Sequence, residues 1–161
     1  MHRYEKFTIL FFGEGASEKK FFVALEKSDK FKSQFDKAWN ISIDNASGSA
    51  CKIILGKCIC VCQGRSFDLI FCFIDTDKLY QDYPKNFIEE RDKLEKVAEE
   101  NNIIIIWQEK NHEEELSKAI EKKVKKRKVK KMISENEIKL MNSDFVKKIL
   151  IHISDYQAKN N

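Results

Sequence analysis

Proline and glycine are scarce in this chain: Pro84 is the one proline among 161 residues, and there are five glycines. Both residues favour turns and irregular loops, so long structureless linkers are not expected. Long hydrophobic runs are missing too, and no stretch is long enough to span a bilayer. Residues 1–6 are polar, and the apolar run 8–12 is too short for the core of a secretion signal. These absences predict a cytoplasmic protein with no membrane segment.

The number and the spacing of the cysteines do not indicate disulfides. Five are present, at Cys51, Cys58, Cys60, Cys62 and Cys72, and they lie in otherwise apolar runs. This pattern suits reduced thiols in a protein core better than disulfide pairs. The Cys-x-Cys-x-Cys run has no later matching pair, so it is a weak zinc signal, and core packing is the favoured interpretation.

The remaining composition is that of a soluble globular protein, with 42% hydrophobic and 35% charged residues. We expect one domain over residues 1–161, with a core at about 6–125 and a helical extension at about 126–157. Net charge is +4, and a dense basic block contributes to it. The cations of this basic block are Lys122, Lys123, Lys125, Lys126, Arg127, Lys128, Lys130 and Lys131. Such a block is compatible with binding to a nucleic acid or to an acidic protein, and also with having no partner.

Hydrophobic periodicity predicts strands that alternate with helices. The apolar or alternating runs typical of strands are residues 7–12, 39–44, 67–74 and 103–107. Helical spacing is expected over residues 17–27, 50–62, 85–101, from about 113 into the basic block, and 144–156. Strand–helix alternation predicts an α/β fold: a mainly parallel four-stranded sheet with helices on both faces and extra C-terminal helices.

Side chains that cap helices suggest where these helices begin. Ser17 and Ser49 are candidate N-caps, and Ser134 with Glu137 is a candidate capping box. Residues 79–84 are expected to form a loop.

Three acidic residues follow predicted strands and are the main functional signal. Glu14 comes in the turn after the first strand, and Asp75 and Asp77 close the third. The carboxyl ends of parallel strands share one edge of the sheet, where ligands bind in α/β proteins. Carboxylates brought together repel one another, and a divalent cation removes that cost. The sequence therefore predicts a Mg²⁺ or Mn²⁺ site at this edge.

Two motifs give this pattern a family resemblance. The run GEGASEKKFF at residues 13–22, followed later by Asp75-Thr76-Asp77 after a hydrophobic strand, resembles the two motifs of Toprim domains. These are the metal-binding catalytic domains of topoisomerases, primases, and OLD-type and RloB-type nucleases. The RloB-like branch is more similar still, because Gly48-Ser49 matches its turn before the second helix. Asn111 with Glu115-Leu116 matches its motif after the fourth strand.

The resemblance implies a metal-dependent nuclease or related phosphotransfer enzyme acting on DNA or RNA. It implies that Asp75 and Asp77 hold metal and that Glu14 is a general acid/base or a further ligand. Glu115, or Glu18, would support a second ion. It also implies a role in defence against phages or mobile elements, beside a partner ATPase. No tyrosine domain of the topoisomerase type fits in this length.

Simpler interpretations stand beside these. Glu18 is expected mainly to favour the helix dipole, and Glu115 belongs to an acidic helix start that needs no function. His112 is expected at the surface, on the rim of the site. The alternative function is an inactive Toprim-like module that binds nucleic acid or a protein partner. A different α/β phosphohydrolase or a response-regulator receiver is a third interpretation, and Gly13-Glu14-Gly15 with Asp-x-Asp fits a receiver poorly.

Overall fold

The structure is a computed structural model that describes residues 7–33 and 39–160, apart from the side chains of Lys126 and Phe145. The predicted outer limits of the domain, within residues 1–6 and at 161, lie outside the described residues. The strands are β1 (Phe7–Gly13), β2 (Trp39–Asn45), β3 (Leu69–Asp75) and β4 (Ile104–Gln108). The helices are α1 (Ala16–Lys27), α2 (Asp29–Lys32), α3 (Cys51–Cys62), α4 (Thr76–Asp82), α5 (Phe87–Glu100), α6 (His112–Ile120), the 3₁₀ turn η1 (Lys126–Lys128), α7 (Val129–Glu135), α8 (Glu137–Met141) and α9 (Asp144–Lys159).

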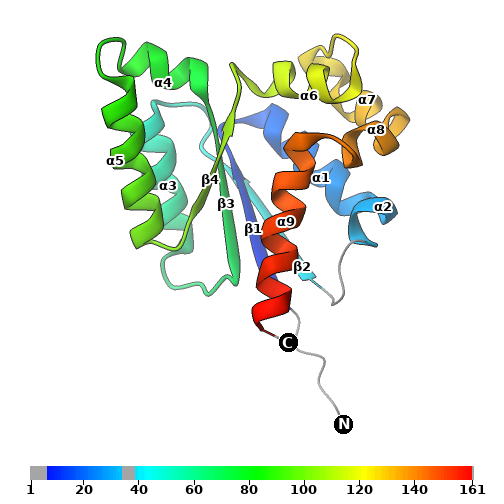
Figure 1. The fold of residues 1–161 in the computed structure, drawn as a ribbon, viewed down its shortest axis with the longest axis horizontal. Coiled ribbons are helices and arrows are strands. Elements are labelled where there is room, and N and C mark those ends of the chain that lie inside the picture. The colour runs from blue at the N-terminus through cyan, green and yellow to red at the C-terminus, as the bar shows by residue number, and fades with distance from the viewer. Residues whose placement is uncertain (1–6, 34–38, 161) are drawn as a thin grey trace.

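The four strands form one parallel sheet in the order β2-β1-β3-β4 (Figure 1). β1 and β3 occupy the middle, and their apolar side chains are buried on both faces, as expected for strands covered by helices on each side. The predicted α/β class and its parallel four-stranded sheet are confirmed. This architecture is consistent with a Rossmann-like or Toprim-type fold.

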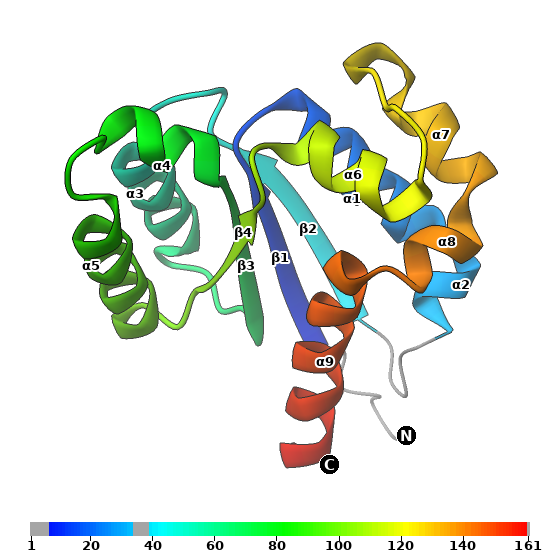
Figure 2. The ribbon, with the colours of Figure 1, turned by 45° about the horizontal axis from the view of Figure 1, so that its top comes forward.

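The two faces of the sheet carry different cores. One face is aromatic, with the rings of Phe11 and Phe71 stacked at 5.7 Å between neighbouring strands and Phe22 of α1 packed 5.3 Å from Phe11. Helices α1, α2 and α6 to α9 cover this face. Helices α3, α4 and α5 cover the opposite face, where Cys58 and Cys72 are buried among aliphatic residues. Figure 2 shows the two helical layers on either side of the strands.

Several predicted boundaries were wrong. Residues 79–84 were expected to be a loop, yet helix α4 follows β3 directly and runs to Asp82. The helix expected to run from about residue 113 into the basic block ends at Ile120, where Glu121 adopts a left-handed conformation with φ 60°. The basic block is therefore a connector, a 3₁₀ turn and the start of α7.

Helix starts also differ from the predicted caps. Gly15 precedes α1 in place of Ser17, Ala50 precedes α3 in place of Ser49, and Ser134 lies inside α7, so it caps nothing. All five cysteines are free thiols, as expected, but Cys60 is exposed, so core packing is wrong for that residue. Within the described residues, every helix is too short or too polar to traverse a lipid bilayer.

Candidate metal centre

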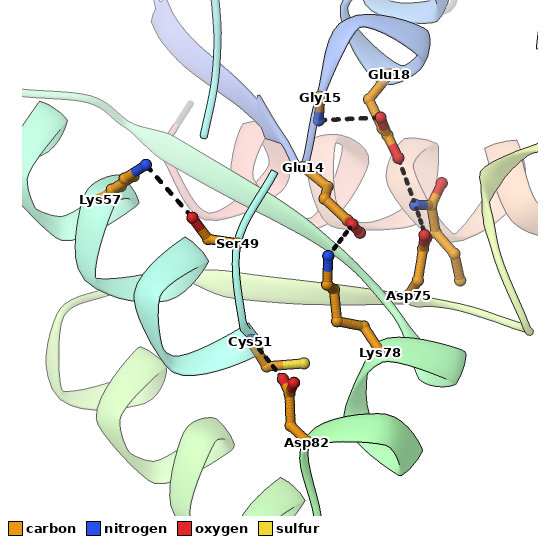
Figure 3. Close-up of polar contacts among 10 residues, drawn as sticks. Glu14, Gly15, Glu18, Ser49, Cys51, Lys57, Asp75, Lys78 and Asp82 are labelled. Atoms are coloured by element: carbon orange, nitrogen blue, oxygen red, sulfur yellow. Dashed lines mark hydrogen bonds and ion pairs between the residues drawn. The ribbon is translucent and has the colours of Figure 1, made fainter. Parts of the chain in front are cut away.

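Three strands end at one edge of the sheet and bring polar side chains together there. Glu14 follows β1, Asp75 closes β3 and Gln108 closes β4. β3 pairs with both β1 and β4, and Asp75 lies directly opposite Gln108 in the register of β3 with β4. The predicted meeting of Glu14 and Asp75 at this edge is confirmed (Figure 3).

The carboxylates of Glu14, Glu18 and Asp75 form a compact group, which we call the carboxylate cluster. Each offers one oxygen, and these oxygens all lie within 4.8 Å of one another. Glu18 is 5% exposed. Three hard oxygen donors at this spacing form a group that can bind a metal ion. The interpretation of Glu18 as a helix-dipole residue alone misses this placement.

Glu18 reaches the cluster because the chain between β1 and α1 is tightly packed. Its Oε2 accepts a hydrogen bond from the Gly15 backbone N–H at 3.2 Å. Gly13 allows this approach, because a Cβ atom there would lie 2.4 Å from the Cβ of Glu18 and 3.0 Å from Cε2 of Phe22. Close packing therefore requires a glycine at position 13, which is a structural reason for the first residue of the GEG run.

The backbone of Glu14 is held by the turn after β2. The N–H of Gly48 donates to the Glu14 carbonyl at 2.8 Å, and the N–H of Ala46 donates to the Gly13 carbonyl at 3.0 Å. Three successive residues in this turn, at positions 47–49, have positive φ angles. Such a conformation is costly for the two serines that flank Gly48, and it persists where the surrounding structure imposes it.

A buried amide links two of the carboxylates. Nε2 of Gln108 donates to Oδ1 of Asp75 at 2.7 Å and to Oε1 of Glu18 at 3.4 Å. On its other side, Oε1 of Gln108 lies 2.6 Å from Nδ1 of His112. The amide nitrogen therefore faces the acidic oxygens, which accept from it. Its oxygen then faces His112, which carries its proton on Nδ1.

His112 is a core residue, which corrects the predicted position on the surface. Its exposed fraction is 1%, and its ring packs 5.1 Å from the ring of Phe21. Burial lowers the pKa of His112 to about 3, so the imidazole is neutral at physiological pH. It therefore acts as a fixed donor that orients Gln108 (exposed fraction 0%).

Lys78 of α4 places a positive charge against the cluster. Its Nζ lies 2.9 Å from Oε1 of Glu14, in a hydrogen-bonded ion pair drawn in Figure 3. The other oxygen of Glu14, Oε2, is buried without a hydrogen-bond partner within the described part of the chain. An unsatisfied buried carboxylate oxygen is costly, and a bound cation would satisfy it.

The electrostatics of the cluster are those of crowded acids. Burial, followed by the charges of Glu14 and Glu18, raises the pKa of Asp75 to about 9. The pKa of Glu18 is also raised, chiefly by burial and then by Glu14, although hydrogen bonds oppose the shift. Without a cation the cluster therefore holds a proton at neutral pH, and a divalent ion would displace that proton.

Asp77 and Glu115, the other two predicted ligands, are not brought into this cluster. Asp77 lies in the first turn of α4, and its backbone N–H donates to the carbonyl of Lys110 at 3.0 Å. Oε1 of Glu115 accepts a hydrogen bond from the N–H of Glu109 at 2.8 Å, which ties the start of α6 to the end of β4. Asn111 caps α6 by accepting from the N–H of Glu114.

The basic block lies at the surface, with its two valines turned inward. Val124 is 5% exposed and Val129 is fully buried, so both fix the backbone of the block to the aromatic core. The side chain of Lys126 lies outside the described part. The remaining cations are all exposed: Lys122, Lys123, Lys125, Arg127, Lys128, Lys130 and Lys131.

Comparisons of the chain with protein-family models, with curated proteins and with solved structures found no match.

Proposed function

We propose that this chain is a metal-dependent nuclease or a related phosphotransfer enzyme that acts on phosphodiester bonds of DNA or RNA. The observation that supports it best is the carboxylate cluster: Glu14, Glu18 and Asp75 offer oxygens within 4.8 Å of one another at the carboxyl edge of a parallel sheet. Hard oxygen donors on a rigid scaffold favour Mg²⁺ or Mn²⁺. The Toprim-like order of the motifs agrees with this chemistry.

The residues present fit such an ion, because Oε2 of Glu14 is buried without a hydrogen-bond partner among the described residues and the crowded acids favour a nearby positive charge. A bound divalent ion would stabilise negative charge on a phosphodiester during attack. Glu14 would hold or move a proton of an attacking water. Gln108 fixes the orientation of Asp75. Asp77 and Glu115 remain predicted ligands.

The basic block is the proposed nucleic-acid contact. The buried side chains of Val124 and Val129 fix the backbone that carries the exposed cations, so this backbone does not have to become ordered when a nucleic acid binds. Contacts between cations and phosphates weaken steeply as salt increases. From the family resemblance, the proposal extends to a role in defence against phages or mobile elements, beside a partner ATPase.

A cleavage assay with matched variants tests the enzyme. Plasmid, single-stranded DNA and RNA are incubated with the protein in Mg²⁺ or Mn²⁺, and again with a chelator. Glu14→Gln, Glu18→Gln and Asp75→Asn should each abolish cutting, because each removes a ligand charge while preserving shape. Glu114→Gln is the control, because this exposed acid of α6 lies outside the carboxylate cluster. Cutting that survives in all three cluster variants, or in chelator, contradicts the proposal.

The second candidate is an inactive Toprim-like module that binds nucleic acid or a protein partner. One observation favours it: Lys78 and Gln108 already supply donors to the carboxylates, so the fold holds them without a metal. Binding to labelled DNA or RNA that is unchanged by chelator, with no cutting under any condition, would support the module. A melting temperature unmoved by millimolar Mn²⁺ would point the same way.

A further inference from the structure

Within the described residues, the side chains of Gln108 and Lys78 donate to the carboxylate cluster, and they are held very differently. Gln108 is fully buried and is fixed from behind by His112. Lys78 is 26% exposed in its side chain, and its ammonium meets Glu14 at the end of a flexible four-carbon stem. The amide is therefore a permanent part of the site, whereas the ammonium can leave without disturbing the core.

The carboxylate of Glu14 can be bound by Lys78 or by a divalent cation. Lys78 Nζ holds Oε1, while Oε2 is buried without a partner in the described part of the chain. An ammonium and a divalent cation close to one carboxylate repel each other, so they compete for it. Lys78 forms its ion pair with Glu14, and Asp82 is a second carboxylate whose charge acts on it. Asp82 already accepts from the N–H of Cys51 at 2.8 Å, which leaves Glu14 as the main anchor of Lys78.

We propose that Lys78 is a displaceable counter-ion of the site, which leaves Glu14 when a divalent cation binds and then contacts a phosphate of the substrate. The inference rests on the proposed function and adds a residue to it. A released ammonium on α4 remains at the edge of the site, where the nearest new anion is the substrate. Metal and substrate then bind cooperatively, because the phosphate stabilises the position of Lys78 that metal binding requires.

Mn²⁺ titration by calorimetry, without substrate, is the first test. Lys78→Met removes the charge and keeps the length of the side chain, so it should bind Mn²⁺ about tenfold more tightly than the unmodified protein. Lys93→Met is the matched control, because it removes a Lys–Glu pair at 3.1 Å on α5, away from the site. Its Mn²⁺ affinity should be unchanged. Lys78→Gln is a second variant in case the methionine disturbs folding, which melting in chelator would reveal.

Cleavage at saturating Mn²⁺ is the second test. Lys78→Met should cut at least tenfold more slowly although it binds metal better, and Lys78→Arg should retain most of the rate because it keeps a cation. A phosphorothioate oligonucleotide, used as an uncut ligand, should tighten Mn²⁺ binding in the unmodified protein and have little effect on it in Lys78→Met.

The outcomes separate the two proposals. If the unmodified protein binds Mn²⁺ and cuts, but Lys78→Met and Lys78→Gln bind Mn²⁺ equally or more weakly, the displacement of Lys78 is wrong and the nuclease stands. If neither the unmodified protein nor the Lys78 variants bind Mn²⁺, the metal site itself is wrong and this inference falls with it.

Discussion

Replacing Asp75 by asparagine should make the metal-free protein more stable and abolish the proposed binding of metal. The pKa of Asp75 is raised from 3.8 to about 9 by burial and by its acidic neighbours. Between these values the native state keeps a proton that the unfolded chain has lost. Stability from this group is therefore fully present below pH 4 and is lost as pH rises toward 9. Asparagine resembles the protonated acid and has no such dependence.

The magnitude follows from the width of that pH window. Each pKa unit corresponds to about 1.4 kcal/mol, and pH 7 lies roughly three units above the ordinary pKa of an aspartate, which gives an upper limit of about 4 kcal/mol. Asp75 is only partly buried, so water reduces this figure, and a gain of about 1–4 kcal/mol in the free energy of unfolding is expected. For a chain of this length, that is a rise of about 3–12 °C in melting temperature.

The measurement is urea unfolding in chelator at pH 4, 5.5, 7 and 8. The advantage of Asp75→Asn should be near zero at pH 4 and should grow with pH. Asp77→Asn, which changes an aspartate outside the carboxylate cluster, should show no such trend. Millimolar Mn²⁺ should reverse the order by stabilising only the protein that keeps Asp75. An Asp75→Asn protein that is no more stable at pH 8 than at pH 4, relative to the unmodified chain, would refute the assignment of a crowded, protonated cluster.

Three further predictions test the supports of the site and its surface. Gly13→Ala should lower the free energy of unfolding by about 1–3 kcal/mol and weaken Mn²⁺ binding, because the new methyl group collides with Glu18; unchanged binding in calorimetry would contradict this. His112→Leu should weaken Mn²⁺ binding, because it leaves the oxygen of Gln108 without its donor. His112→Asn can still donate, so its Mn²⁺ affinity should be closer to that of the unmodified protein. Equal Mn²⁺ affinities of the two variants would refute the orienting role of His112. Lys130→Glu should weaken nucleic-acid binding and make it depend less steeply on salt, as measured by fluorescence anisotropy across a salt series. An unchanged salt dependence would show that the basic block is not part of the interface.

The strands were predictable because each carries a short apolar run, and their parallel pairing follows from strand–helix alternation; the strand order β2-β1-β3-β4 was not predicted. The helix α4 was not, because residues 79–84 contain polar groups and Pro84, which are typical of a loop. Its start is fixed by tertiary bonds: the N–H of Asp77 donates to Lys110, and the N–H of Lys110 donates to Oγ1 of Thr76. Contacts between segments more than thirty residues apart leave no local pattern to read.

The same reasoning separates the predicted and the missed site residues. Glu14 and Asp75 were predictable because each follows an apolar strand. Glu18 was undervalued because a glutamate in the first helical turn already has a local explanation. Gln108 was missed, although a polar residue that closes the apolar run at 103–107 was a usable signal. His112 gives no sign in the sequence that it is buried, because its ring packs against Phe21 of α1, a residue far from it in the sequence.

Gln108 lies on β4, an edge strand, so the geometry of the site depends on how stably β4 stays paired with the sheet. β4 is an edge strand that pairs with β3 alone over five residue pairs, whereas the other edge strand, β2, pairs with β1 over seven. Detachment of β4 would remove Gln108, the shared donor of Asp75 and Glu18, while the rest of the domain stayed folded. A metal ion bound to the carboxylates, as proposed, would therefore favour the paired state of β4, and slower deuterium exchange at the amides of β4 is the expected result of adding Mn²⁺.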